Sequence, residues 1–125
     1  MTTWTGDELT AIGEADELDL ASRRADGSLR DSVTIWVVRV GDALYVRCMN
    51  GPAGAWYRGA QTLRRGRVSA GGVAAEVTFA AADPALHERI DGVYRTKYRR
   101  YGDGVIGSVV NPGARAATIE LIPER

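Results

Sequence analysis

The sequence predicts a mainly β, α+β domain built on a six-stranded antiparallel sheet that can close into a barrel. Short segments rich in β-branched and aromatic residues recur along the chain, as strands require. Two pairs of these segments are joined by the two-residue turns Gly41–Asp42 and Gly71–Gly72, which are typical of antiparallel hairpins. Six strands with turns this short can form a barrel. We expect residues 1–125 to form one domain.

The first element is expected to be a helix that ends near Ala15. In the segment WTGDEL, Thr5 has the position of the N-cap and Glu8 that of its partner in a capping box. Trp4 and Leu9 have the spacing of a hydrophobic staple, which packs the incoming chain against the helix.

Five strands and a short helix account for the middle of the chain. The segment LDLASRR alternates as a half-buried strand does, and ADG turns the chain after it. The segment SVTIWVVRV is almost entirely apolar, so we expect one central strand covered on both faces. In chain order the sequence predicts strands over 18–24, 32–40 and 43–48, a helix over 56–63, and strands over 67–70 and 73–79.

The last third predicts a long helix and a closing strand. Asp83 is placed as an N-cap with Pro84 at the first helical position, and the helix should run to about Tyr101, with Gly102 ending it. A loop to about Gly113 and an alternating strand over 116–122 follow. The barrel core should include the following apolar residues: Leu20, Val33, Ile35, Val37, Val46, Val77, Phe79, Ile119 and Leu121.

Composition excludes several classes of protein. No apolar run approaches the ~20 residues of a membrane span, and no signal peptide pattern opens the chain, so a cytoplasmic protein is expected. One cysteine and one histidine cannot make a structural zinc site. The net charge is zero and no aromatic residues interleave with the basic ones, which argues against nucleic acid as a partner.

The basic residues are nevertheless unevenly placed. Residues 21–67 carry nine arginines against three aspartates, whereas residues 1–20 carry six acids and no base. A local positive field of this kind can concentrate an anionic ligand. Alternatively, the acidic and basic segments neutralise each other on the surface.

Two basic stretches are candidates for binding an anion. Arg23 and Arg24 end the first strand, and arginine binds phosphate or carboxylate through a two-pronged fork; a solvated strand end explains them equally well. The stretch NGPAGAWYRG offers a flexible backbone followed by a helix start, which favours negative charge. Its candidate residues are Asn50, Gly51, Trp56, Tyr57 and Arg58, with Trp56 as a core anchor remaining the alternative.

Three tyrosines form one face of the predicted long helix. Tyr94, Tyr98 and Tyr101 are spaced i, i+4 and i+7. Together they suit the wall of a cleft, where a hydroxyl could donate a proton or orient a substrate. The same spacing suits a helix that packs on the barrel with its hydroxyls at the rim.

These segments together resemble a known superfamily. The span from Arg23 to Gly72, with its GD hairpin, Gly-rich loop, WYRG helix start and GG turn, is similar to the core of the split-barrel flavin and deazaflavin proteins, which include the deazaflavin-dependent nitroreductases. More narrowly, WTGDEL, VTIWVVRVGDALYVR and KYRRYG resemble a family of short bacterial proteins classed as a domain of unknown function.

The resemblance implies an FMN-binding-like split barrel that holds FMN or a deazaflavin and catalyses hydride transfer to a small organic molecule. By position it assigns the cofactor to Arg23, Arg24, Thr34, Trp36, Asn50, Gly51, Trp56, Tyr57 and Arg58, and catalysis to Tyr94, Tyr98 and Tyr101. Ser22 and Gly59 replace a glycine and an asparagine of the family pattern. The alternative is a cofactor-free enzyme or small-molecule-binding protein that keeps the same cleft. The resemblance leaves both a monomer and a homodimer open.

Overall fold

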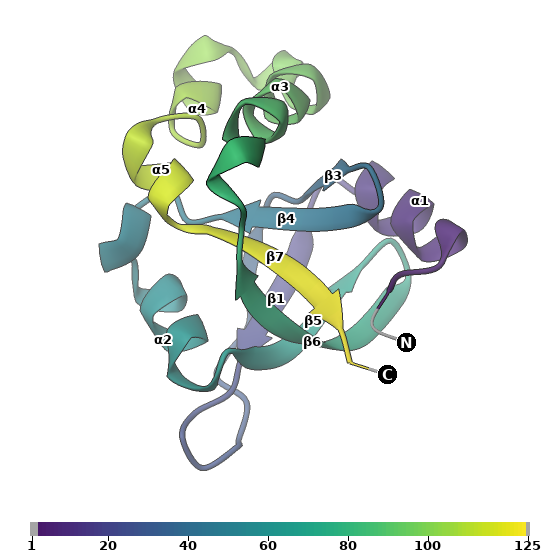
Figure 1. Cartoon of the computed structure of the whole chain (residues 1–125), viewed down its shortest axis with the longest axis vertical. Coiled ribbons are helices and arrows are strands. Elements are labelled where there is room, and N and C mark those ends of the chain that lie inside the picture. Colours follow the sequence, from purple (N-terminus) through teal and green to yellow (C-terminus); the bar gives the residue numbers. More distant parts are fainter. Residues whose placement is uncertain (1–2, 125) are drawn as a thin grey trace.

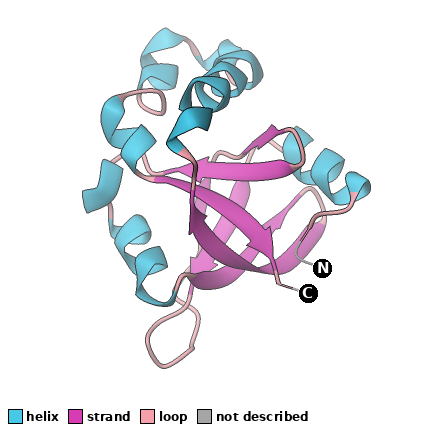
Figure 2. Ribbon diagram, in the orientation of Figure 1, coloured by secondary structure: helices cyan, strands magenta, loops and turns pink. Residues whose placement is uncertain are grey.

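The computed structural model describes residues 3–124 and shows a curled, fully antiparallel sheet of seven strands flanked by helices (Figures 1 and 2). The strands are β1 (Leu18–Ser22), β2 (Val33–Ile35), β3 (Val38–Val40), β4 (Ala43–Arg47), β5 (Arg65–Ala70), β6 (Val73–Ala81) and β7 (Thr118–Pro123). The helices are α1 (Gly6–Glu14), α2 (Ala55–Leu63), α3 (His87–Lys97), α4 (Asp103–Gly107) and α5 (Pro112–Ala116). The order across the sheet is β2-β1-β5-β6-β7-β4-β3.

The prediction of six strands is wrong at one place, the predicted central strand over residues 32–40. This segment forms two short strands, β2 and β3, which lie at opposite edges of the sheet. Only Trp36 and Val37 connect them, so the sheet must curl until its two edges approach each other, although they do not pair. The sheet is therefore a half-barrel that opens at this connection.

Side chains satisfy the backbone at the connection in place of a strand ladder. The Val37 N–H donates to the Tyr98 hydroxyl at 3.2 Å, and the Val37 carbonyl accepts from Lys97 Nζ at 2.6 Å. A buried backbone group without a partner would be costly, so these contacts allow Val37 to leave the ladder while fully buried.

The local signals at the start of the chain are confirmed. Thr5 Oγ1 accepts from the Glu8 N–H at 3.1 Å, and Glu8 Oε1 accepts from the Thr5 N–H at 2.9 Å, so the capping box is present. Trp4 and Leu9 are both buried in one core cluster. In addition, Trp4 Nε1 donates to the Leu121 carbonyl at 2.9 Å, which fastens the N-terminal segment to β7.

The predicted long helix is shorter than expected. A 3₁₀ turn over Pro84–Leu86 precedes α3, and a second over Arg99–Tyr101 follows it. Such turns are common at helix ends, where the last hydrogen bonds tighten. Asp83 caps the first turn as predicted, since its Oδ1 accepts from the Ala85 N–H at 2.9 Å. The predicted loop after Gly102 contains α4 and the start of α5.

Two clusters of buried apolar residues lie on the two faces of β4. Leu44 and Val46 face the interior of the half-barrel, whereas Tyr45 faces α3. Among the predicted core residues, Val33 and Ile35 are only half-buried, because β2 is an edge strand that pairs with β1 alone. The other predicted core residues are buried: Leu20, Val37, Val46, Val77, Phe79, Ile119 and Leu121.

Candidate functional site

A cavity of about 310 Å³, here called the tryptophan cavity, opens beside the β2–β3 connection. It is bounded by β2, the end of β4 with the loop after it, the first turn of α2 and the segment after α4. Its lining residues are Glu17, Val33, Thr34, Ile35, Trp36, Arg47, Met49, Asn50, Trp56 and Val109. Four of the predicted site residues are thus brought together here: Thr34, Trp36, Asn50 and Trp56.

Trp36 is held rigidly in the wall of this cavity. Its ring stacks on Tyr98 with centroids 3.9 Å apart and an interplanar angle of 4°. Tyr98 is itself fixed, because its hydroxyl donates to the Asp16 carbonyl at 2.6 Å and accepts the Val37 N–H. Burial raises the pKa of the Tyr98 phenol, so it stays protonated. The indole therefore presents a preorganised flat apolar surface.

The prediction that Tyr94, Tyr98 and Tyr101, here called the tyrosine stripe, together form the wall of a cleft needs correction. Tyr94 and Tyr98 are both 0% exposed, and neither lines the cavity. They pack in the cluster beneath α3, because the helix turns this face toward β3 and β4. Only Tyr101 is exposed, with its ring 5.2 Å from that of Trp36. The stripe is thus the support behind Trp36, and Tyr101 alone reaches solvent beside it.

A buried charge cluster that the sequence reasoning missed also borders the cavity. Arg47 lines the cavity although its side chain is 0% exposed. It forms an ion pair with Asp91, and Nε donates to Thr118 Oγ1 at 2.9 Å. Nη1 also donates to the Val109 carbonyl at 2.8 Å. An arginine within the apolar segment ALYVRC was the available signal, because a buried arginine requires partners.

The cluster keeps a net positive charge. Asp91 also pairs with Arg115, so one carboxylate serves two guanidinium groups. Burial alone would raise the pKa of Asp91, but the hydrogen bonds and charges of Arg115 and Arg47 hold it below its ordinary value. His87 lies beside Arg47, and burial together with that positive charge lowers its pKa, so the imidazole is neutral at neutral pH.

A second cavity of about 320 Å³, the arginine cavity, adjoins the first and shares Val33 and Trp56 with it. The remaining residues that line it are Leu20, Ser22, Arg24, Arg30, Asp31 and Ala55. Ala55 begins α2, whose N-cap Gly54 has no side chain to accept hydrogen bonds from the N–H groups of the first turn. Such a helix start favours a negatively charged group.

Arg30 is a second candidate site residue that the sequence did not indicate. Its Nε atom is buried and forms no hydrogen bond to the residues that the structure describes. A Cβ placed on Gly59 would lie 3.0 Å from that atom and 3.1 Å from Ser22 Oγ. Gly59, which departs from the family pattern, therefore lets Arg30 approach α2 closely. Arg24 lines the same cavity, and its Nη1 donates to the Leu29 carbonyl at 2.8 Å.

The other predicted residues lie elsewhere. Arg23 forms an ion pair with Glu76 and donates to the Gly27 carbonyl, so it stabilises the strand end. Arg58 is exposed on α2 and lines neither cavity, whereas Tyr57 packs against the barrel core. Gly51 has φ +70°, and a Cβ there would lie 3.3 Å from the Gly113 carbonyl oxygen. Its role is to allow the loop to approach α5.

The loop that enters α2 is packed tightly against Cys48. A Cβ on Gly54 would lie 2.2 Å from Cys48 Sγ, so Gly54→Ala should lower the free energy of unfolding by about 1–3 kcal/mol through overpacking. In a Cys48→Ala background the same substitution should cost less. The coupling free energy between the two substitutions should be about 0.5–3 kcal/mol. Urea denaturation of the four proteins of this double-mutant cycle measures it. An equal cost in both backgrounds would show that Cys48 is not the obstacle.

A metal-binding cluster and a membrane-spanning helix are both absent from the part of the chain that the structure describes. Residues 3–124 contain no group of three or more histidine, cysteine, aspartate or glutamate side chains placed to hold a metal ion. Within the same residues, no helix has both the length and the apolar character needed to cross a membrane.

A known protein family matches most of this chain. Residues 8–121 match the family described as "Uncharacterized protein conserved in bacteria (DUF2255)". No curated protein sequence matches the chain.

Similar solved structures share the fold at low identity. A structure titled "F420 Reductase" has a TM-score of 0.59 and 16% identity, covering 93% of this chain and 92% of that one. A FAD-binding protein from Mesorhizobium loti has the same TM-score and identity, covering 98% and 92%. A conserved hypothetical protein, Rv2991 from Mycobacterium tuberculosis, has a TM-score of 0.58 and 12% identity, covering 99% and 83%.

Proposed function

The chain belongs to the DUF2255 family of proteins conserved in bacteria, and from its half-barrel fold and its two joined cavities we propose that it binds a flavin or deazaflavin and acts as an oxidoreductase on a small organic molecule. The observation that carries the proposal is the pairing of a flat, tryptophan-walled cavity with an arginine-lined one. A ring system and a phosphate on one molecule need such a pair of environments.

The residues of the tryptophan cavity fit the ring of such a cofactor. Trp36 and Trp56 supply apolar aromatic surface, and Val33 and Ile35 supply aliphatic surface. Ligand sites combine mostly apolar walls with a few placed polar groups, and their volumes start at about 300 Å³. Here the polar groups are those of Glu17, Thr34, Arg47 and Asn50.

The residues of the arginine cavity fit its phosphate. Arg30 has a buried Nε–H that lacks a partner among residues 3–124, and Arg24 has an exposed guanidinium at the same cavity. The first turn of α2 adds N–H groups that its N-cap Gly54, which has no side chain, does not cap. Guanidinium groups and a helix start both favour phosphate oxygens.

The buried Arg47 cluster supports redox chemistry at the tryptophan cavity. A flavin or deazaflavin supplies hydride transfer when bound. Since two arginines share Asp91, a positive charge remains behind the cavity wall and favours electron density that gathers there. Tyr101, exposed beside Trp36, is the one member of the predicted tyrosine stripe that can contact a substrate.

A titration with cofactor tests the proposal. Purified protein freed of ligand should bind FMN or a deazaflavin, followed by the change in cofactor absorbance and fluorescence. Arg30→Ala and Arg24→Ala should each weaken binding about ten- to hundredfold, because each removes a charge-assisted contact to the phosphate. Riboflavin, which lacks the phosphate, should bind the variants and the wild type alike.

Arg58→Ala is the matched control, since Arg58 is an exposed arginine of α2 that lines neither cavity. Its effect should be less than about threefold, which corresponds to the small energy of screened surface charges. If the wild-type protein binds neither FMN nor a deazaflavin at high micromolar concentration, the redox proposal fails. The joined cavities would then serve a small molecule without a cofactor.

A further inference from the structure

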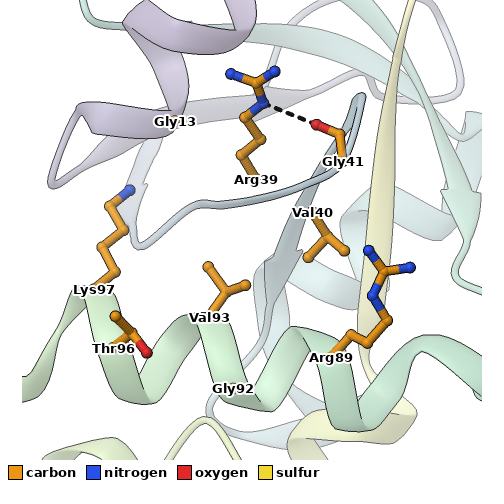
Figure 3. A pocket seen from close by; sticks show the side chains of 9 residues that line it. All are labelled: Gly13, Arg39, Val40, Gly41, Arg89, Gly92, Val93, Thr96 and Lys97. Carbon is orange, nitrogen blue, oxygen red and sulfur yellow. Dashed lines mark hydrogen bonds between the residues drawn. The ribbon is translucent and has the colours of Figure 1, made fainter.

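A third concave surface, here called the cationic groove, lies between α1, the β3–β4 hairpin and α3 (Figure 3). It is an open groove of about 630 Å³. Its lining residues are Gly13, Arg39, Val40, Gly41, Arg89, Gly92, Val93, Thr96 and Lys97. None of them lines the tryptophan cavity or the arginine cavity, so the groove is a separate place on the molecule.

The charged residues of the groove all have the same sign. Arg39, Arg89 and Lys97 stand around it, and no acidic residue lines it. Arg89 forms no hydrogen bond or ion pair with residues 3–124 in the structure, and Lys97 donates to the Val37 carbonyl with one of its three N–H groups. Arg39 donates through Nε to the Gly41 carbonyl at 2.8 Å. Its Nη2 lies 4.0 Å from Asp42 Oδ1, and the Asp42 side chain is almost fully exposed. All three cations therefore keep donors for a ligand.

The floor of the groove is apolar. The side chains of Val40 and Val93 lie between the flanking cations in Figure 3. A ligand with a carbon skeleton between its anionic groups would place that skeleton on the two valines. Bare inorganic ions would leave this surface uncovered.

Gly92 keeps the groove open at a cost to the helix. It lies within α3, where glycine is the least favourable residue after proline. Its φ is not positive, and a Cβ there would meet no atom within 4 Å. Neither backbone conformation nor packing therefore requires glycine at this position. A side chain there would project into the open space that the groove occupies.

We propose that the cationic groove is a second binding site, for a small organic molecule that carries two or more negative charges. Arg39, Arg89 and Lys97 would bind the anionic groups, and Val40 and Val93 would contact the carbon skeleton. Phosphate esters and polycarboxylates share this chemistry.

Calorimetric titration at about 0.1 M salt with two probes, glycerol 1,3-bisphosphate and citrate, tests the proposal and separates the two ligand sources. Arg89→Gln and Arg39→Gln should each weaken binding of the better probe about tenfold or more, the usual effect of losing a charge-assisted contact. Gly92→Leu should abolish binding by filling the groove while the melting temperature stays at or above that of the wild type.

Arg95→Gln provides the matched control. Arg95 is an exposed arginine of the same helix that does not line the groove, so it tests whether any positive charge on α3 has the same effect. Its effect should be less than about twofold at moderate ionic strength, where charges further apart than about 10 Å are screened. The proposal is overturned if neither probe binds at millimolar concentration, or if Arg95→Gln weakens binding as much as Arg89→Gln.

The pH dependence of citrate binding adds an independent readout. Burial lowers the pKa of Lys97 to about 8, Asp16 partly opposes this shift, and Arg100 adds to it. The protonated amine is the form that binds an anion, so the affinity of the wild type for citrate should fall as the pH rises from 7 through about 9. Lys97→Met should bind more weakly at pH 7 and show a flat profile. An unchanged profile in Lys97→Met would contradict a role of Lys97 in the groove.

Discussion

Replacing Asp91 by asparagine (Asp91→Asn) is expected to lower the free energy of unfolding by about 3–5 kcal/mol. Asp91 is 1% exposed and neutralises Arg47, whose side chain is fully buried beside the tryptophan cavity. Removing the carboxylate leaves a buried guanidinium without a counter-charge, and desolvating an unpaired charge is strongly unfavourable. Urea denaturation followed by circular dichroism measures the change.

Asp16→Asn is the matched control, because it removes the acid of an exposed ion pair with Arg100. We expect a loss of about 0–1 kcal/mol there. Asp91→Asn should also remove a pH dependence that the wild type has. The pKa of Asp91 is depressed in the folded state, so its contribution is present above the unfolded-state pKa of about 3.9 and is lost as the pH falls through the folded-state pKa. Equal losses for both variants at pH 7 would contradict the assignment of a buried charge cluster.

Tyr98→Ala is expected to lower the free energy of unfolding by about 3–5 kcal/mol, the usual cost of truncating a large buried aromatic side chain. Tyr98 is fully buried, stacks on Trp36 and hydrogen-bonds Val37 at the point where the chain passes from one sheet edge to the other. The substitution therefore creates a cavity and removes the support of the β2–β3 connection. Thermal and urea denaturation of the ligand-free protein measure it.

Two further variants separate packing from hydrogen bonding. Tyr98→Phe keeps the ring but leaves the buried Val37 N–H without its acceptor, which should cost about 1–3 kcal/mol. Tyr101→Ala removes the exposed tyrosine of the same stretch and should change stability by less than about 0.5 kcal/mol. If Tyr98→Ala were as mild as Tyr101→Ala, the wall behind Trp36 would not be a structural support.

The sequence by itself determined the elements whose causes are local. The capping box of Thr5 and Glu8 formed as predicted, because it joins residues three apart. Gly41 adopts a positive φ in the first predicted turn, and Gly71 and Gly72 both do so in the second, which is the conformation that tight hairpin turns require. The strands on either side of these turns pair as expected, from Val40 with Ala43 and from Ala70 with Val73.

The sequence also located part of the candidate site. Thr34, Trp36, Asn50 and Trp56 line one cavity although they come from three separate segments. The resemblance that grouped them rests on the hairpin, the loop and the helix start. The curl of the sheet then brings these segments to one cavity. Arg30 escaped prediction because nothing near it in the sequence distinguishes a ligand-facing arginine from a solvated one. The apolar neighbours of Arg47 indicate burial, but they do not show which cavity it borders.

Only the tertiary structure decided where an apolar strand would break and which face of a helix would be buried. The segment over residues 32–40 is almost entirely apolar, so its pattern does not show that Trp36 and Val37 leave the sheet. They leave because the two edges of a curled sheet must meet, and Tyr98, more than sixty residues away, accepts the freed Val37 N–H. In the same way, spacing placed Tyr94 and Tyr98 on one face of the predicted helix, but only packing against β3 and β4 decided that this face is buried. Long-range contacts set both outcomes, since burial depends on what covers a residue and not on its neighbours in the chain.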